Sequence, residues 1–177
     1  MIGVLVSGEG TNLRALIDER LPIAAVASNR ADARALERAE RAGVPTAVFP
    51  LADFATREER DAAMASWLES GGVRVVVLAG YMHVLTSAFL ARFPERIVNV
   101  HPSLLPDFPG LHAVDAALAA GVATTGVTVH VVDEGVDTGP ILRQEHVPVE
   151  PRDTLLDRIH AVEHRLLPET VRELIER

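Results

Sequence analysis

Residues 73–79 read Val-Arg-Val-Val-Val-Leu-Ala, a nearly unbroken apolar run with four β-branched side chains. Such a run is typical of a strand that is covered on both faces, as the strands of parallel sheets are. The segment before it, residues 57–70, is predicted to be a helix that ends at Gly71-Gly72. A buried strand directly after a helix favours an α/β fold with a parallel sheet.

The same rhythm extends outward along the chain. We expect further strands at 2–6, 23–27, 46–49 and 97–100, and helices at 12–19, 31–42, 86–92 and 113–120. This alternation predicts a Rossmann-like, doubly wound, mostly parallel sheet with helices on both faces. After residue 120 the pattern changes to two strands, 125–132 and 141–149, which predict a mixed or antiparallel C-terminal edge. A helix is expected over 153–177, with a kink at Pro168.

The composition restricts the class of protein. The 177 residues are 48% hydrophobic, enough for one folded domain with a proper core, and we expect a single domain over 1–177. The net charge of −8 disfavours nucleic-acid binding, and the lack of cysteine excludes thiolate chemistry and Cys-ligated metals. No apolar run reaches the length of a membrane span, and the first strand begins directly after Met1 without a signal peptide. We therefore expect a cytoplasmic protein.

Polar side chains gather where the strand at 97–100 ends, in Asn99-Val-His-Pro-Ser-Leu-Leu-Pro-Asp-Phe-Pro-Gly110. Asn99 and His101 are two residues apart, so strand geometry directs both side chains to one face. An amide can stabilise negative charge on an oxygen, and an imidazole exchanges a proton near neutral pH. The three prolines keep the following loop stiff. The pair is a candidate for holding a reacting group, and the alternative is a loop-capping pair without function.

The turn Ser7-Gly-Glu-Gly-Thr-Asn12 joins the first strand to the first helix. Its two glycines allow close backbone approach, and a helix N-terminus offers free N–H groups and a positive dipole end. It is not a dinucleotide fingerprint, because Leu13 stands at the third glycine position, and it lacks the ending of a P-loop. The turn is either a phosphate cradle or a tight turn in which Thr11 or Asn12 caps the helix.

Two other polar clusters have open interpretations. Asp133, Glu134 and Asp137 crowd one loop, where they could relay protons, bind a cation or form a solvated turn. His130, before this loop, is interpreted on its own as a hydrogen-bonded core histidine. The last helix contains His160-Ala-Val-Glu-His164, which matches a zinc-peptidase motif. A catalytic zinc needs a third ligand, which only the acidic loop could supply, so a partly exposed helix face is the simpler interpretation.

Taken together, these segments resemble the phosphoribosylglycinamide formyltransferases, a family of folate-dependent formyltransferases of purine synthesis. The matching pieces run in the family's order over almost the whole chain. They are Ser7–Asn12, Ala79-Gly-Tyr-Met82, Asn99-Val-His-Pro-Ser-Leu-Leu-Pro106, Pro109-Gly-Leu-His112, Gly126-Val-Thr-Val-His130 and Asp133-Glu-Gly-Val-Asp-Thr-Gly-Pro140. The segment 109–112 favours this family over formyltransferases acting on methionyl-tRNA and over formyltetrahydrofolate deformylases.

The resemblance implies transfer of a formyl group from 10-formyltetrahydrofolate, as co-substrate, to the primary amine of glycinamide ribonucleotide, without a metal. It assigns catalysis to Asn99, His101 and Asp137. Asn99 and a protonated His101 would stabilise the oxyanion that develops when the amine attacks the formyl carbon. Asp137 would influence the protonation of His101 and help to move a proton, through water, to the departing folate nitrogen.

Binding roles follow from the same resemblance. The residues implied for the phosphate and glycinamide are Gly10, Thr11, Asn12 and Glu163, and those implied for folate are Arg57, Met82, His83, Val84, Leu85, Asn99 and Asp133. An arginine at position 57 suits the glutamate carboxylates of a folate. His83 is a departure, because some members carry arginine there.

The resemblance also divides the domain, with the phosphate or nucleotide side in the N-terminal half and the catalytic and folate side in residues 80–140. The expected partners are the two small-molecule substrates, not nucleic acid or membrane, and the chain is expected to be a monomer or homodimer. Two other functions stay open: a deformylase-type hydrolase, and a non-catalytic folate or nucleotide binder. The phosphate turn and Glu163 disfavour the hydrolase, and the set Asn99, His101 and Asp137 disfavours the binder.

Overall fold

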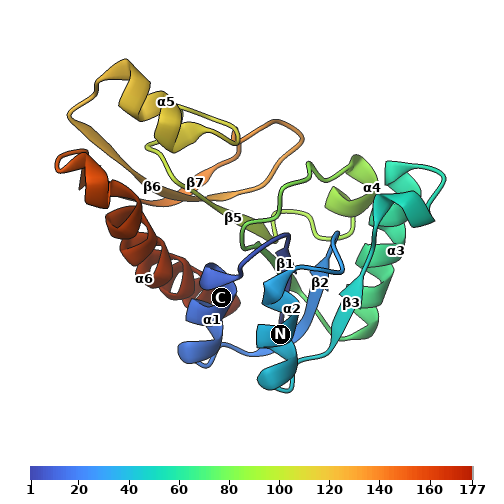
Figure 1. Cartoon of the computed structure of the whole chain (residues 1–177). Helices are drawn as coiled ribbons and strands as arrows, with labels where there is room; N and C mark the ends of the chain where they lie inside the picture. Colours follow the sequence, from blue (N-terminus) through green and yellow to red (C-terminus); the bar gives the residue numbers. More distant parts are fainter. Residues whose placement is uncertain (177) are drawn as a thin grey trace.

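One sheet contains both parallel and antiparallel strands, in a computed structural model that describes residues 1–176. The parallel strands are β1 (Ile2–Val6), β2 (Ile23–Ser28), β3 (Thr46–Val48), β4 (Val75–Leu78) and β5 (Ile97–His101). The antiparallel strands are β6 (Thr124–Val131) and β7 (Ile141–Pro148). They lie in the order β3-β2-β1-β4-β5-β6-β7 (Figure 1). The predicted doubly wound sheet with a mixed C-terminal edge is confirmed.

The helices lie close to their predicted positions. They are α1 (Thr11–Asp18), α2 (Arg34–Arg41), α3 (Arg57–Ser70), α4 (Ser87–Leu90), α5 (Ala113–Ala120) and α6 (Leu155–Glu176), with short 3-10 turns at Leu51–Asp53 and Arg152–Thr154. The bounds of α3 and α5 agree with the prediction. The last helix begins at Leu155 rather than at 153, because the residues before it form a 3-10 turn, and it continues through Pro168. Arg177 lies outside the described residues.

Two apolar layers enclose the sheet, because alternate side chains of each strand point to opposite faces. Val4 and Val6 of β1 pack in a cluster with residues of α1, α2 and α6. Leu5, between them, packs in a second cluster with residues of α3 and α4. Figure 1 shows α1, α2 and α6 together on one side of the sheet and α3 on the other. The predicted cover on both faces is therefore confirmed.

The antiparallel edge has a direct consequence for the polar residues. Because β6 pairs with β5 in antiparallel register, Asn99 lies opposite His130 and His101 lies opposite Thr128. A parallel neighbour would have placed these residues at different heights along the strand. The reversal of direction therefore brings side chains from both strands to the same end of the sheet.

The strand order reverses between β1 and β4, since β2 and β3 lie on one side of β1 and the later strands on the other. In open α/β sheets, ligands bind beyond the carboxyl ends of the strands at such a switch point. The turn after β1, the segment after β4 and the end of β5 all meet there. Within residues 1–176, no helix has the length and apolar character that crossing a membrane requires.

Candidate active site

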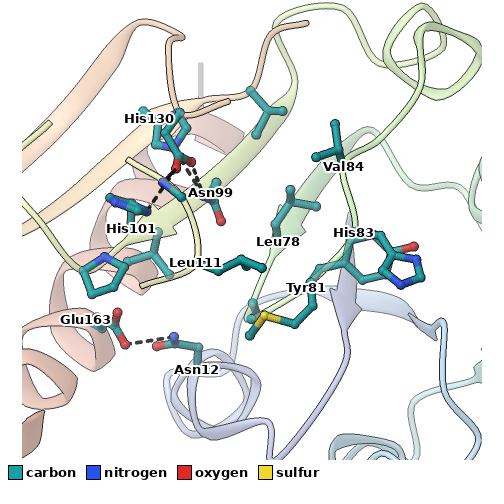
Figure 2. A pocket seen from close by; sticks show the side chains of 18 of the residues that line it. Asn12, Leu78, Tyr81, His83, Val84, Asn99, His101, Leu111, His130 and Glu163 are labelled. Carbon is teal, nitrogen blue, oxygen red and sulfur yellow. Dashed lines mark hydrogen bonds and ion pairs between the residues drawn. The ribbon is translucent and has the colours of Figure 1, made fainter. Parts of the chain in front are cut away.

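A cavity of about 420 Å³ lies at this switch point. Its walls come from the turn between β1 and α1, the segment 78–85 after β4, the end of β5 with the loop behind it, the loop 130–137, and two residues of α6. Figure 2 shows how these side chains surround one space, with Asn99, His101 and His130 on one side and Asn12 and Glu163 on another. The fold therefore brings residues from each of the predicted polar clusters to the wall of one cavity.

The predicted catalytic residues are in contact with one another. Asn99 Nδ2 donates a hydrogen bond to Asp137 Oδ1 at 3.4 Å, and His101 Nδ1 lies 3.3 Å from Asp137 Oδ2. His130 completes the group, since its Nε2 lies 3.3 Å from Asn99 Nδ2 and 3.5 Å from Asp137 Oδ1. Two strands and one loop thus place an amide, a carboxylate and two imidazoles within hydrogen-bonding distance.

Asp137 is held as a carboxylate by its surroundings. Burial by itself would raise its pKa, but hydrogen bonding from His130, the Gly110 N–H at 2.8 Å and the charge of the nearby imidazoles together lower the pKa to about 2. Its backbone has a positive φ of 54°, which non-glycine residues seldom adopt. This conformation belongs to the loop that turns the carboxylate toward both imidazoles. A permanent negative charge therefore lies beside His101 and His130 at neutral pH.

His101 is buried and has a partner at each ring nitrogen. Nε2 lies 2.8 Å from the carbonyl oxygen of Phe108, and Nδ1 faces Asp137. A carbonyl oxygen and a carboxylate are both acceptors, so a protonated ring can donate to both, whereas a neutral ring can donate to one only. The ring is positioned by the Pro-rich loop on one side and the acidic loop on the other.

The Pro-rich loop is fixed by buried hydrogen bonds in addition to its prolines. Thr128 Oγ1 donates to the Ser103 carbonyl oxygen at 2.7 Å and accepts from the Leu105 N–H at 3.1 Å. Gln144 Nε2 donates to both Thr128 Oγ1 and the Leu105 carbonyl oxygen. Ser103 Oγ donates to the Asp107 carbonyl oxygen at 2.5 Å. The loop is therefore also fixed by tertiary contacts, because side chains of β6 and β7 form hydrogen bonds with its backbone.

The turn after β1 presents an uncapped helix end to the cavity. Helix α1 begins at Thr11, and its N-cap is Gly10 with a φ of 72° and no side-chain cap. The alternative in which Thr11 or Asn12 caps the helix is therefore wrong, because both residues are already helical. The first N–H groups of a helix have no partner inside it, so they are available to an anion at the cavity.

Position 10 accepts only glycine. A Cβ there would lie 2.6 Å from the Cβ of Ala35 in α2, and the positive φ already disfavours other residues. The turn packs closely on α2 on one side and lines the cavity on the other.

Glu163 enters the same side of the cavity from α6. Its side chain is 6% exposed and accepts a hydrogen bond from Asn12 Nδ2 at 3.1 Å. Burial raises its pKa to about 7, and the bond from Asn12 offsets only part of this effect. Asn12 Oδ1 is buried without a partner among the described residues, so an acceptor and a carboxyl group are both free for a ligand.

The zinc interpretation of the motif at 160–164 gains no support. Glu163 faces Asn12, and the rings of His160 and His164 stack on each other with centroids 6.0 Å apart. Across the described part of the chain, no group of three or more His, Asp or Glu side chains is placed to hold a metal ion.

The remaining wall is apolar and open to solvent. Four large apolar side chains on it are exposed, namely Met82, Val84, Leu111 and Val136. Leu85 and Asp133 also line the cavity, and Leu85 is buried. Asp133 Oδ1 accepts from Thr138 Oγ1 at 2.7 Å and from the Gly135 N–H, so it shapes its own loop. This wall suits a flat, largely apolar ligand.

Arg57 and His83, both predicted to contact folate, lie outside the cavity or at its edge. Arg57 donates to the Val84 carbonyl oxygen at 2.7 Å and does not line the cavity within residues 1–176. His83 lines its edge, but Figure 2 shows the ring extending away from Asn99 and His101. Its Nδ1 faces the buried side chain of Arg60 instead.

Sequence reasoning missed two residues of this region. His130 contacts Asn99 and Asp137 rather than an ordinary core, and the signal was its placement two residues after Thr128 and seven before Asp137. Arg60 was not singled out, because a charged residue inside a predicted helix is usually exposed. It is fully buried here.

Comparison with known proteins agrees with this geometry. A family model described as "Formyl transferase" matches residues 1–171. Phosphoribosylglycinamide formyltransferase of Haemophilus influenzae is 42% identical over 184 residues, which cover 99% of this chain and 87% of that protein. The crystal structure of glycinamide ribonucleotide transformylase 1 from Symbiobacterium toebii superposes with a TM-score of 0.95 at 50% identity, covering 99% of this chain and 87% of that one.

The same region occurs inside longer proteins. A trifunctional purine biosynthetic protein of Drosophila melanogaster is 43% identical over 98% of this chain, and this chain spans only 14% of its length.

Proposed function

Because the chain belongs to the formyl transferase family, we propose that it is a phosphoribosylglycinamide formyltransferase. It transfers a formyl group from 10-formyltetrahydrofolate to the primary amine of glycinamide ribonucleotide, a step of purine synthesis. The names of its relatives support the reaction class. The site residues are assigned below from the geometry of the cavity.

One observation carries the proposal: two differently built sites share one cavity. The uncapped N-terminus of α1, Asn12 and Glu163 form a polar end, and the cluster around Asp137 lies across the same space. A hydrolase that passes the formyl group to water has no need of an anion cradle with a carboxyl group beside it. A transferase needs both, because it must hold an amine acceptor that carries a phosphate.

We assign the acceptor to the polar end. The free N–H groups at Thr11 and Asn12, with Gly10 allowing their approach, would bind the phosphate. Glu163 would accept a hydrogen bond from the glycinamide portion, and its pKa of about 7 lets it bind either as an acid or as a carboxylate near neutral pH.

We assign the folate co-substrate to the apolar wall formed by Met82, Val84 and Leu85, with Asn99 and Asp133 as polar contacts. The exposed apolar side chains there would be covered by the ring system. Arg57 lies next to this wall through its bond to Val84, and it would attract the glutamate carboxylates from the surface.

The proposed chemistry uses the cluster around Asp137. The amine nitrogen attacks the formyl carbon. The Asn99 amide donates to the oxygen on which negative charge develops, and a protonated His101, whose two N–H groups face Phe108 and Asp137, stabilises that charge electrostatically. The carboxylate of Asp137 stabilises a protonated His101 and orients water that carries the amine proton to the folate nitrogen. The carbon–nitrogen bond to folate then breaks, and that nitrogen leaves with the proton.

The test is a spectrophotometric assay of loss of the formyl group from 10-formyltetrahydrofolate or a deaza analogue, with and without glycinamide ribonucleotide. Loss that depends on the acceptor is expected. Loss at equal rate without the acceptor would contradict the proposal and indicate a deformylase. Binding of the folate without any loss would indicate a binder.

A further inference from the structure

A buried ion pair lies behind the proposed folate wall. Arg60 and Asp61 of α3 have fully buried side chains, and both Arg60 Nε and Nη2 donate to Asp61 Oδ1, at 2.9 and 2.7 Å. Asp61 Oδ2 accepts from the Thr86 N–H at 2.7 Å. Isolating charges from water is costly, so such a pair requires partners that use its remaining donors and acceptors. One such partner is the backbone N–H of Thr86, directly after the proposed folate wall.

The remaining donor of Arg60 fixes the state of His83. Arg60 Nη1 lies 2.6 Å from His83 Nδ1. A guanidinium has donors only and stays charged, so Nδ1 must be the acceptor. A ring that accepts at Nδ1 is neutral and carries its hydrogen on Nε2.

This tautomer determines how the side-chain amide of Asn29 is oriented. The side-chain amide of Asn29 lies 3.2 Å from His83 Nε2 and 2.6 Å from Ser7 Oγ, which in turn accepts from the Met82 N–H at 2.9 Å. Since Nε2 donates, it pairs with the Asn29 side chain when the amide oxygen faces His83 and the amide nitrogen faces Ser7. The two ends of an amide have nearly the same shape, and their partners decide between them.

The charges around His83 act in the same direction. Burial lowers its pKa, Arg60 and Arg57 lower it further, and Asp61 opposes them. Tyr81, whose ring lies 5.9 Å away, is the other titratable neighbour, and burial raises its pKa to about 12, so it stays neutral. His83 thus contributes no positive charge beside the proposed folate wall.

We propose that Arg60 is a positioning residue for the co-substrate: it holds His83 as the neutral Nε2–H tautomer and, with Asp61, fixes the segment 82–86 that forms the folate wall. The relay runs from Asp61 through Arg60, His83 and Asn29 to Ser7, and so connects α3 to the turn after β1. The effect on folate rests on the proposed function, whereas the tautomer does not.

The experiment compares three proteins by kinetics and folate-analogue binding. Arg60→Met/Asp61→Asn removes both charges together, and an asparagine at 61 can still accept from the Thr86 N–H. Arg60→Lys keeps one donor for His83 Nδ1. The matched control, Arg92→Met/Glu69→Gln, removes an ion pair between α3 and the short segment that follows α4. This pair is partly exposed and lies outside the cavity.

We expect the double variant at 60 and 61 to raise the KM and Kd for the folate about 10-fold, with kcat and the KM for the acceptor within about 2-fold, since one charge-assisted hydrogen bond positions the wall. Arg60→Lys should restore most of the affinity, and the control should change nothing. A folded double variant with unchanged folate affinity would overturn the positioning role.

The second measurement needs no folded variant of the ion pair. Nitrogen-15 NMR of the imidazoles in the unaltered protein, with His83 assigned by the loss of its signals in His83→Gln, should show an Nε2–H tautomer at pH 8 and a titration midpoint clearly below the ordinary value. A His83 that titrates near the ordinary value of 6.5 would overturn the inference and leave the enzyme's function intact. Absence of acceptor-dependent formyl transfer would overturn the proposed function and leave this readout intact.

Discussion

At the scale of single residues, the cavity holds two carboxyl groups in opposite states. Hydrogen bonds and imidazoles lower the pKa of Asp137 to about 2, whereas burial raises that of Glu163 to about 7. Environments that separate the pKa values of two acids are a mark of assigned acid–base roles. Asp137 is therefore suited to stabilise positive charge, and Glu163 to respond to a ligand.

His101 is the residue whose loss should affect turnover most. We expect His101→Ala to lower kcat by about 10²–10⁴-fold with little change in the Kd for either substrate, because the positive charge of the protonated ring acts on negative charge that develops only in the transition state. Steady-state kinetics and equilibrium binding of a folate analogue measure the two effects separately. His146→Ala, an exposed histidine on β7, is the control. A near-normal kcat in His101→Ala would remove it from the mechanism.

At the scale of elements, the N-terminus of α1 is the anion site that we propose for the acceptor. Thr11→Val keeps the volume and the backbone N–H but removes the hydroxyl at the first helical position. We expect the KM for glycinamide ribonucleotide to rise several-fold, about what one hydrogen bond contributes, with the folate KM unchanged. Steady-state measurement of the KM for each substrate tests this prediction. The reverse pattern would show that the two substrate sites have been interchanged.

Strand β6 supports the loop that carries the Phe108 carbonyl to His101. Thr128→Val removes an Oγ1 with three partners and leaves a buried N–H, a carbonyl oxygen and an amide short of a bond. We expect the free energy of unfolding to fall by about 2–4 kcal/mol, with a lower kcat, because unsatisfied buried polar groups are costly. Chemical denaturation measures it.

The control for this change is Thr124→Val, at the exposed start of the same strand. Equal losses of stability in the two valine variants would show that β propensity, not the loop contacts, is responsible.

At the scale of the whole molecule, Glu163 makes stability depend on pH. Its folded pKa, about 7, lies above the ordinary 4.5, so the folded state binds the proton more tightly than the unfolded state does. Stability is therefore lost as the pH rises from about 4.5 to about 7, by roughly 3 kcal/mol in total. Asp137 has the opposite effect and acts only below about pH 4, since its folded pKa is lowered.

We expect Glu163→Gln to be more stable than the unaltered protein at pH 8, and the gain to shrink toward zero at pH 5. Glutamine still accepts from Asn12 but carries no charge to bury. Urea denaturation at the two pH values measures the difference, and Glu58→Gln, exposed on α3, is the control. A gain of equal size at both pH values would contradict the role of burial. Weaker binding of the acceptor is the expected functional loss.

Local patterns were enough to predict most elements. Apolar runs and glycine stops predicted the five parallel strands, and the bounds of α3 and α5 were predicted to the residue. The errors are of one to three residues at ends, as at residues 152–154, where 3-10 hydrogen bonding before the first turn of α6 rather than periodicity sets the boundary. The antiparallel edge was also predicted, because its two strands follow each other without a helix between them.

The sequence by itself determined the fold class and the placement of Asn99 and His101 on one strand face, because strand periodicity is a local property. Only the tertiary structure decided that His130 joins Asp137, that Arg60 is buried against His83, and that Glu163 faces Asn12 across 151 positions. Those contacts depend on strand register and on which helix face packs inward. Neither is local, since both follow from how apolar faces far apart in the chain exclude water together.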